Sequence, residues 1–175
     1  MDLPRLTLIT GGARSGKSSH AIAIATAYPG SRGFFLASAE PSDDEMRARI
    51  ERHRNDRPAG FVTIEEPVAL CEALESLEGR ADVVVLDCLT LWVANLMTRG
   101  LDDPAIMAEA DRLVAALSRV SFGAAVVTGE VGAGIVPVNP AARRFRDLLG
   151  WINQKVARAS DRVILMAAGY PMVVK

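Results

Sequence analysis

Short apolar runs alternate along the chain with longer segments in which apolar residues recur at helical spacing. The clearest apolar runs are residues 6–10, 33–38, 82–88, 124–131 and 162–168. Strands that are apolar on both faces, and are separated by helices, are typical of a parallel sheet covered on both sides. The pattern predicts an α/β fold with a mostly parallel central sheet. Residues 61–66 and 171–175 are weaker candidates for further strands.

Residues that typically start or end helices predict where the helices lie between these runs. The expected helices span residues 17–27, 42–57, 67–77, 90–97, 104–119 and 141–159. Ser42 and Glu45, three residues apart, form a capping box that predicts a helix start at Ser42. Pro58 is expected to end that helix, and Pro67 to occupy the first position of the next one.

The composition describes an ordinary soluble globular domain. The chain has 175 residues, half of them apolar, and a net charge of −1, so we expect a single domain over residues 1–175 and no nucleic-acid partner. No apolar run is long enough for a membrane span, and residues 1–12 lack the layout of a signal peptide. Cys71 and Cys88 have neither metal-ligand nor redox spacing, so a reduced, cytoplasmic setting is expected.

Residues 11–18 read GGARSGKS and match the phosphate-loop (P-loop) motif G-x-x-x-x-G-K-[ST]. The motif follows an expected strand and opens an expected helix, where backbone N–H groups can point at phosphate oxygens. Lys17 would pair with the β- and γ-phosphates, and Ser18 would ligate Mg²⁺. A Gly-rich turn with a chance lysine is the alternative. The motif predicts a nucleoside triphosphate site without naming a reaction.

Asp87 ends the apolar run VVVLD. An acid at the end of a buried strand beside a P-loop can hold Mg²⁺, directly or through water. The alternative is an aspartate that caps the helix after it. The base-reading N-K-x-D and the switch sequence D-x-x-G of regulatory GTPases are both absent, so that class is disfavoured.

His53 is one of two histidines and lies in the charged stretch RIERHRNDRP, residues 49–58. On a helix it shares a stripe with Met46, Ile50 and Arg57. It could be a core histidine with a satisfied hydrogen bond, or part of a solvated face. It could also be a nucleophile, because neutral imidazole attacks phosphorus near pH 7. His20, by contrast, is expected to be structural or partly exposed.

Several segments together resemble one family. They are GGARSGKS, ASAEPSDDEMRARIERHRNDRP, VVLDCLTLWVANL, TGEVGAGIVPVNPAARRFRDLLGWINQKVARASDRV and the closing lysine. They resemble the bifunctional adenosylcobinamide kinase/adenosylcobinamide-phosphate guanylyltransferase of cobalamin synthesis. The resemblance implies a RecA-like P-loop fold, a homo-oligomer, and adenosylcobinamide and adenosylcobinamide phosphate as substrates. It also implies phosphorylation by ATP or GTP, followed by GMP transfer from GTP through a guanylylated histidine.

The same resemblance implies the site residues. His53 would carry GMP, and Lys17 would act in catalysis with it. Ser18 and Asp87 would hold Mg²⁺. Nucleotide contacts carry over to Gly11, Gly12, Ala13, Arg14, Ser15, Gly16, Lys17, Ser18, Ala37, Ser38, Ala39, Arg54, Asn55, Asp56, Arg57, Glu65 and Asp87.

Two departures from the family pattern matter. Gly129 stands where the family often has Asn, and position 87 is Glu in some members. Two rival interpretations remain beside the bifunctional enzyme. One is a simple P-loop small-molecule kinase with a structural His53, and the other is a nucleotide-binding regulatory module without turnover. Because one loop cannot present both α- and γ-phosphates in one pose, the bifunctional enzyme requires the His53 helix or the nucleotide to move.

Overall fold

The computed structural model describes residues 4–175 except 31, 42, 56 and 58. Within that part of the chain, seven strands form one sheet in the order β3-β2-β4-β5-β1-β6-β7. The strands are β1 Leu6–Gly11, β2 Gly33–Ala37, β3 Val62–Glu65, β4 Val83–Asp87, β5 Gly123–Val127, β6 Arg162–Ala167 and β7 Tyr170–Val173. All pairings are parallel except that of β6 with β7. The expectation of an α/β fold with a mostly parallel sheet is confirmed.

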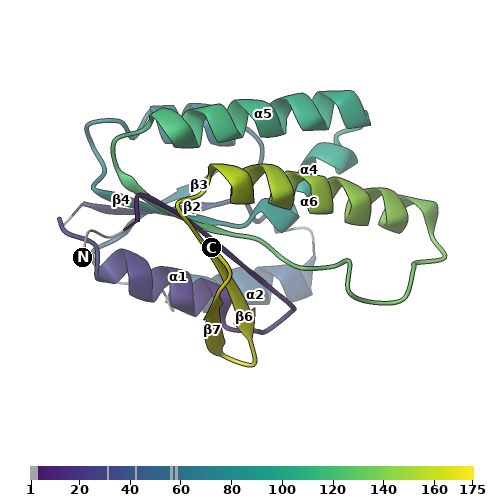
Figure 1. Cartoon of the computed structure of the whole chain (residues 1–175), viewed down its shortest axis with the longest axis horizontal. Helices are drawn as coiled ribbons and strands as arrows, with labels where there is room; N and C mark the ends of the chain where they lie inside the picture. The colour runs from purple at the N-terminus through teal and green to yellow at the C-terminus, as the bar shows by residue number, and fades with distance from the viewer. Residues whose placement is uncertain (1–3, 31, 42, 56, 58) are drawn as a thin grey trace.

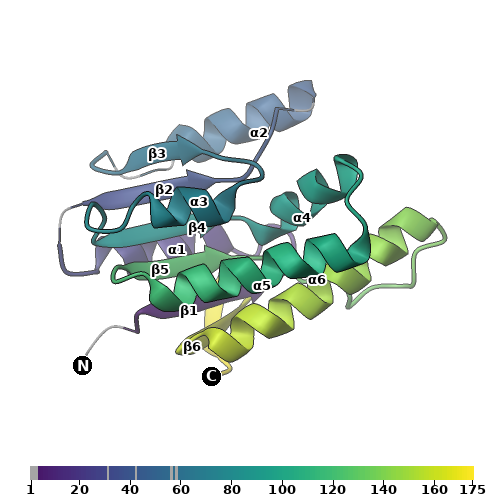
Figure 2. The same ribbon diagram turned by 90° about the horizontal axis from the view of Figure 1, so that it is seen from above.

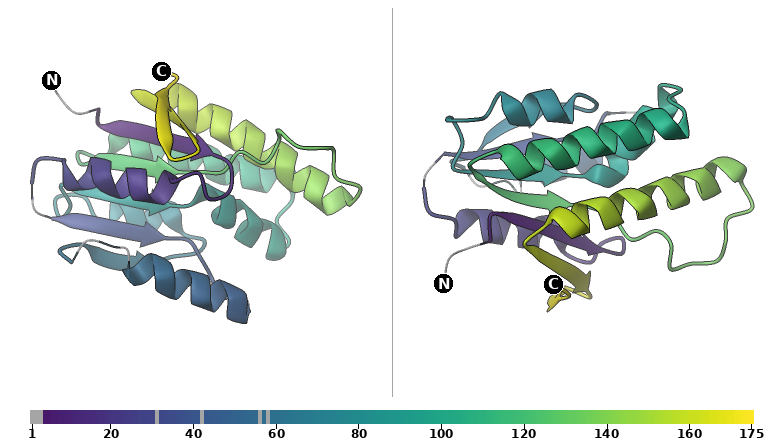
Figure 3. Two further views of the ribbon diagram at one scale, coloured as in Figure 1. Left: turned by 90° about the horizontal axis from the view of Figure 1, so that it is seen from below. Right: turned by 45° about the horizontal axis from the view of Figure 1, so that its top comes forward.

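Helices cover both faces of the sheet (Figures 1, 2 and 3). They are α1 Lys17–Thr26, α2 Asp44–Asn55, α3 Leu70–Glu75, α4 Leu89–Thr98, α5 Asp103–Arg119 and α6 Pro140–Ala159. Helices α3 to α6 pack on one face over a large apolar cluster centred on residues such as Trp92 and Leu149. On the other face α1 packs over a smaller cluster that includes Ala21 and Phe35. Strands β1, β2 and β5 are buried along their whole length, which explains their unbroken apolar runs.

The parallel register gathers the carboxyl ends of the strands at one edge of the sheet. Asp87 at the end of β4 pairs with Ala37 of β2 and with Val127 of β5. β1 lies next to β5 and ends at Gly11, where the P-loop begins. Open parallel sheets bind ligands at this edge, so the fold places the P-loop and Asp87 on the binding side.

Most boundaries lie within two residues of the expected ones, and two differ by three residues or more. α3 begins at Leu70 and not at Pro67, because the Glu66 carboxylate accepts hydrogen bonds from the backbone N–H groups of Val68 and Ala69. β5 ends at Val127 and not at residue 131. Beyond that point the Gly129 N–H donates to the Thr90 hydroxyl and the pairing with β4 stops.

Helix α2 lies at the margin of the molecule, beyond the edge strand β3 (Figure 2). It begins at Asp44, and the Asp43 carboxylate accepts a 2.7 Å hydrogen bond from the Met46 N–H. The expected helix start at Ser42 and stop at Pro58 lie outside the described residues. None of the α2 side chains that the structure describes is fully buried, so this helix is held less firmly than the others.

Candidate active site

The P-loop has the backbone shape that its glycines predict. Gly11 and Gly16 have φ angles of 148° and 93°, which residues with side chains rarely adopt. A Cβ on Gly11 would lie 2.5 Å from the Met166 carbonyl oxygen. Helix α1 begins at Lys17, directly after the loop. The loop N–H groups therefore lie beside the positive end of the helix dipole, where anions bind.

The C-terminal hairpin of β6 and β7 supports this loop. The Gly169 N–H, in the turn between the two strands, donates to the carbonyl of Ser15. Ser15 itself is buried. The Lys17 ammonium group donates to the Gly12 carbonyl at 2.6 Å, so in this state it folds back on its own loop. A bound phosphate would compete for that ammonium group.

Asp87 is half-buried at the carboxyl end of β4, and the backbone after it is pinned by Ser38. The Ser38 hydroxyl donates to the Cys88 carbonyl at 2.6 Å and accepts from the Cys88 N–H at 2.9 Å. The N-cap residue of α4 is Cys88, and no side chain caps that end. The alternative role of Asp87 as a helix cap is therefore wrong.

No group of three or more His, Cys, Asp or Glu residues that could hold a metal ion occurs in the described ranges. Mg²⁺ does not require one, because it is usually held by one or two protein oxygens together with phosphates and water. The hydroxyl of Ser18, in the first turn of α1, and the carboxylate of Asp87 offer that kind of oxygen set. The donor chemistry at this edge therefore fits Mg²⁺ bound with a nucleotide.

The predicted stripe on α2 exists. Met46, Ile50 and His53, together with Arg57 just beyond the helix, are all partly buried, whereas Glu51 and Arg52 between them are exposed. Within the part of the chain that the structure describes, the His53 imidazole has no hydrogen bond or ion pair. A core histidine with a satisfied hydrogen bond is therefore not what the structure contains. His20 is half-buried in α1, as expected, and burial lowers its pKa.

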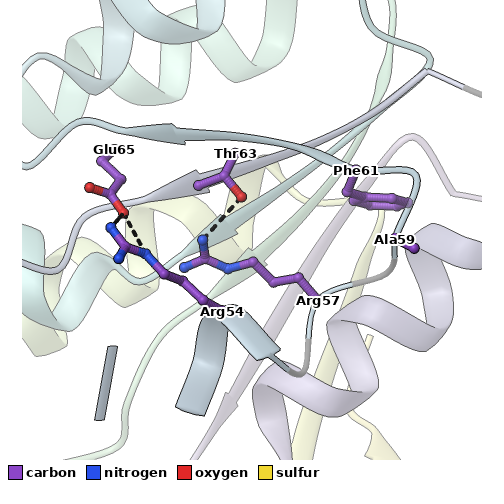
Figure 4. Close-up of a pocket in the computed structure, with 6 residues that line it drawn as sticks. All are labelled: Arg54, Arg57, Ala59, Phe61, Thr63 and Glu65. Carbon is purple, nitrogen blue, oxygen red and sulfur yellow. Dashed lines mark hydrogen bonds and ion pairs between the residues drawn. The ribbon is translucent and has the colours of Figure 1, made fainter. Parts of the chain in front are cut away.

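Arg54 and Arg57 line an open pocket of about 670 Å³ between the end of α2 and the edge strand β3 (Figure 4). This volume is in the usual range for small-molecule sites. Arg54 forms ion pairs with Glu65 and Glu51, and its hydrogen bond to Glu65 is the main cause that raises its pKa. The structure thus brings together three of the predicted nucleotide residues, Arg54, Arg57 and Glu65.

Two contacts hold the Arg57 guanidinium, and one of its donors is left without a partner among the described residues. Its Nη1 donates to the Thr63 hydroxyl at 3.0 Å. Its Cζ lies 4.4 Å from the centre of the Phe35 ring. Its Nε is buried and has no hydrogen-bond partner among the described residues. Burial is the main cause that lowers its pKa. A partly buried guanidinium with an unused Nε donor can bind an anion through a charge-assisted hydrogen bond.

The predicted residues form two groups. The P-loop residues Gly11–Ser18 and the ends of β2 and β4 with Ala37, Ser38, Ala39 and Asp87 lie along the carboxyl edge. The His53 group lies beyond β3, and four strand spacings separate β3 from β1, which is roughly 19 Å at about 4.8 Å per step. Asp56 lies outside the described residues, and the side chain of Asn55 is not described.

One polar cluster beside the P-loop has no counterpart in the sequence-based assignment. The Thr10 hydroxyl donates to Glu130 Oε1 at 2.8 Å, and the Asn153 amide donates to the same oxygen at 3.4 Å. The carboxyl group after the apolar run of β5 was the available signal, as it was for Asp87 after β4. Arg143 and Arg144, in the first turns of α6, donate hydrogen bonds to the carbonyls of Pro137 and Leu101.

No helix in the described part of the chain is long and apolar enough to cross a membrane. Among solved structures, the fold is similar to the assembled ATPase EscN of the enteropathogenic Escherichia coli type III secretion system. The TM-score is 0.62 at 12% identity, over 95% of this chain and 43% of that one. It is also similar to the RadB recombinase, with a TM-score of 0.56 at 14% identity, over 93% of this chain and 74% of that one. These similarities confirm the P-loop, RecA-like fold.

Comparison of sequences identifies the family. The chain is 40% identical over 169 residues to the bifunctional adenosylcobalamin biosynthesis protein CobP of Pseudomonas aeruginosa, covering 96% of each chain. It is 40% identical over 182 residues to the CobU protein of the same description from Escherichia coli K12, covering 97% of this chain and 99% of that one. Residues 7–174 match the family described as cobinamide kinase / cobinamide phosphate guanyltransferase. The expected enzyme class is thereby confirmed, and the chain belongs to this family of cobalamin-biosynthesis enzymes.

Proposed function

We propose that the chain performs both reactions of its family with one P-loop and one nucleophile, His53. The first phosphorylates the aminopropanol hydroxyl of adenosylcobinamide from ATP or GTP. The second transfers GMP from GTP to adenosylcobinamide phosphate and gives adenosyl-GDP-cobinamide. The observation that carries the proposal is the pairing of a P-loop with a histidine that has no hydrogen bond in the described structure and lies beside two arginines at a pocket.

GMP transfer needs a nucleophile and a counter-charge. In the first step an imidazole nitrogen of His53 attacks the α-phosphorus of GTP, and the bond to the α–β bridging oxygen breaks to release pyrophosphate. A phosphate oxygen of the substrate then attacks the same phosphorus, and His53 leaves. Arg54 and Arg57, one and four residues after His53, are placed to offset the negative charge of the transferring group.

The kinase reaction uses the other group of residues. The P-loop N–H groups and Lys17 hold the β- and γ-phosphates, so Lys17 must release the Gly12 carbonyl that it binds here. Ser18 and Asp87 would hold Mg²⁺ at this edge, where it supplies positive charge against the phosphates. ATP, GTP and Mg²⁺ are accordingly the cofactors that we assign to the site.

The separation of the two groups supports a motion between the reactions. The P-loop follows β1 and the His53 group lies beyond β3, four strand spacings away, so we infer that a nucleotide held by the P-loop reaches His53 only when α2 or the nucleotide moves. The lack of fully buried side chains among the described residues of α2 makes it the element that can move at low cost. Structures with nucleotide trapped in each half-reaction test this idea. An identical, rigid nucleotide pose and an unmoved α2 in both would contradict it.

A labelling experiment tests the proposed function. The protein is incubated with Mg²⁺ and GTP labelled at the α-phosphate, then denatured and examined for covalent label. We expect an acid-labile, base-stable adduct in the wild type and in His20→Ala, the matched histidine control, and none in His53→Ala. Cobinamide phosphorylation without any adduct would favour the simple kinase. Absence of both activities would favour a nucleotide-binding module without turnover.

Two further properties belong to the same proposal. The family resemblance supports a homo-oligomer, and the spacing of the two free cysteines supports a reduced, cytoplasmic setting. Analytical ultracentrifugation of the purified chain measures the number of subunits.

A further inference from the structure

Glu130 lies directly against the P-loop, although no predicted role includes it. Its backbone N–H donates to the Gly11 carbonyl at 3.0 Å. It follows β5, the strand that lies between β1 and β4, so it is located between the P-loop and the strand that ends at Asp87. The residue is exposed. A substrate that approaches the terminal phosphate from solvent would therefore meet this side chain.

The Glu130 carboxylate is also held in one orientation. Its Oε1 accepts hydrogen bonds from the Thr10 hydroxyl and the Asn153 amide. Asn153 is buried and is fixed in turn, because its Oδ1 accepts from the Thr128 hydroxyl at 2.7 Å and its Nδ2 donates to the Gly129 carbonyl at 3.0 Å. Both hydrogen bonds to the carboxylate go to Oε1, so Oε2 remains able to accept a substrate proton.

Two other carboxylates near this edge are ion-paired, and Asp87 is assigned to Mg²⁺ in the proposed function. Glu40 forms an ion pair with Arg99, and Glu65 forms one with Arg54. Within the described ranges Glu130 forms no ion pair with an arginine or lysine. Its two side-chain donors are neutral groups, which orient a carboxylate without cancelling its charge. That combination is what a general base needs.

We propose that Glu130 is the general base of the kinase half-reaction, an inference that rests on the proposed function. The substrate hydroxyl oxygen forms a bond to the γ-phosphorus, and the bond from that phosphorus to the β–γ bridging oxygen breaks. The nucleoside diphosphate leaves with the electron pair of that bond. The hydroxyl proton passes to the Glu130 carboxylate. Thr10 and Asn153 are positioning residues that aim the carboxylate.

The segment after Glu130 suits a large, partly apolar substrate. Ile135 and Val138 are 97% and 94% exposed, and Val136 is exposed as well. Apolar side chains that project into solvent beside a site are typical of ligand surfaces. A corrinoid ring is the kind of large, partly apolar ligand that such a loop can contact.

The test measures two half-reactions on the same variants. In Glu130→Gln, we expect the kinase kcat to fall by about 10²–10⁴-fold, the usual contribution of a general base. The KM for ATP and the rate of His53 guanylylation should stay within about threefold of wild type, since neither depends on this proton transfer. The Thr10→Val variant should lower the kinase kcat by about tenfold through loss of the orienting hydrogen bond, and Thr10→Ser should restore it. Glu75→Gln, an exposed carboxylate on α3 paired with Arg119, is the matched control and should change neither activity.

The other possible outcomes also test the proposed role of Glu130. An unchanged kinase kcat in Glu130→Gln would overturn the proposal. So would an equal loss of both half-reactions at unchanged thermal stability, because that result describes nucleotide binding. If Glu130→Gln unfolds, the Thr10→Val and Thr10→Ser pair gives the answer. If the wild type forms no guanylyl adduct, GMP transfer by His53 fails, while the kinase comparison still tests Glu130.

Discussion

Replacing Arg57 with Met should separate stability from nucleotide binding. The substitution removes the hydrogen bond to Thr63 and the contact with the Phe35 ring. Together these are worth about 2–4 kcal/mol. It also removes the buried Nε that has no partner in the described structure, a relief of about 1–3 kcal/mol. The two effects largely cancel, so the net loss in the free energy of unfolding is about 1 kcal/mol.

The effect on nucleotide affinity should be larger. A guanidinium that donates to a phosphate contributes about 1.5–3 kcal/mol, which corresponds to a roughly 10- to 150-fold weaker Kd without it. Urea denaturation measures the first quantity and titration calorimetry with GTP and Mg²⁺ the second. Arg80, which lies over Phe34 at 5.8 Å and outside the pocket, provides the matched control. Arg80→Met should leave the affinity unchanged.

Two results would refute this reasoning about Arg57. One is an unchanged GTP affinity in Arg57→Met. The other is a loss of more than about 3 kcal/mol in the free energy of unfolding, which would exceed the estimate from its contacts and make Arg57 a structural residue of the β3 edge.

Three further predictions concern the core. Thr7 is buried in β1 and its hydroxyl has no partner within the described residues, so Thr7→Val should raise the free energy of unfolding by about 1 kcal/mol in urea denaturation; a decrease would show that the hydroxyl is satisfied. A Cβ on Gly123 would lie 2.4 Å from the Tyr28 ring, so Gly123→Ala should cost about 1–3 kcal/mol of stability through overpacking. Calorimetry should show this cost as a melting temperature that is lower by several degrees. An unchanged melting temperature would mean that the Tyr28 ring moves aside without cost. Burial raises the pKa of Cys71 from 9.0 to about 11, which lowers its thiolate fraction at pH 8 by about 100-fold, so in a Cys88→Ser background a thiol reagent should label Cys71 mainly after denaturation. Because the folded-state pKa exceeds the unfolded one, this thiol also removes stability as the pH rises above 9.0.

The sequence predicts the sheet well because burial on both faces leaves little freedom of composition. β5 is buried at every position and β4 at every position before Asp87, and both runs are apolar enough to be read directly as strands. The predicted start of α3 at Pro67 was wrong for a local reason. The Glu66 carboxylate accepts hydrogen bonds from the N–H groups of Val68 and Ala69, which would otherwise belong to the first turn of the helix. The spacing of apolar residues does not reveal when a side chain competes with a helix for backbone N–H groups.

The candidate site also has one part that the sequence predicts and one part that it does not. The P-loop is a contiguous motif, so its shape and its place before α1 follow from eight consecutive residues. The setting of Arg57 depends on Phe35, which comes from a strand 22 positions earlier in the chain. The hydrogen bond from Thr10 to Glu130 spans 120 positions. Contacts between distant segments can be predicted only when the strand order is known. For that reason neither the Arg57 cluster nor the Glu130 cluster could be assigned from the sequence.

The interior position of β1 in the sheet also determines when the site can form. β1 is synthesised before its two neighbours β5 and β6, and Thr7 of β1 lies opposite Ala125 and Arg162. A nascent chain that has exposed residues 1–120 carries the complete P-loop motif but neither strand that holds β1, nor the Gly169 turn that supports the loop. Pairings of such long sequence separation form late. We therefore expect nucleotide to act as a ligand of the finished protein and to give no help to the folding chain on the ribosome.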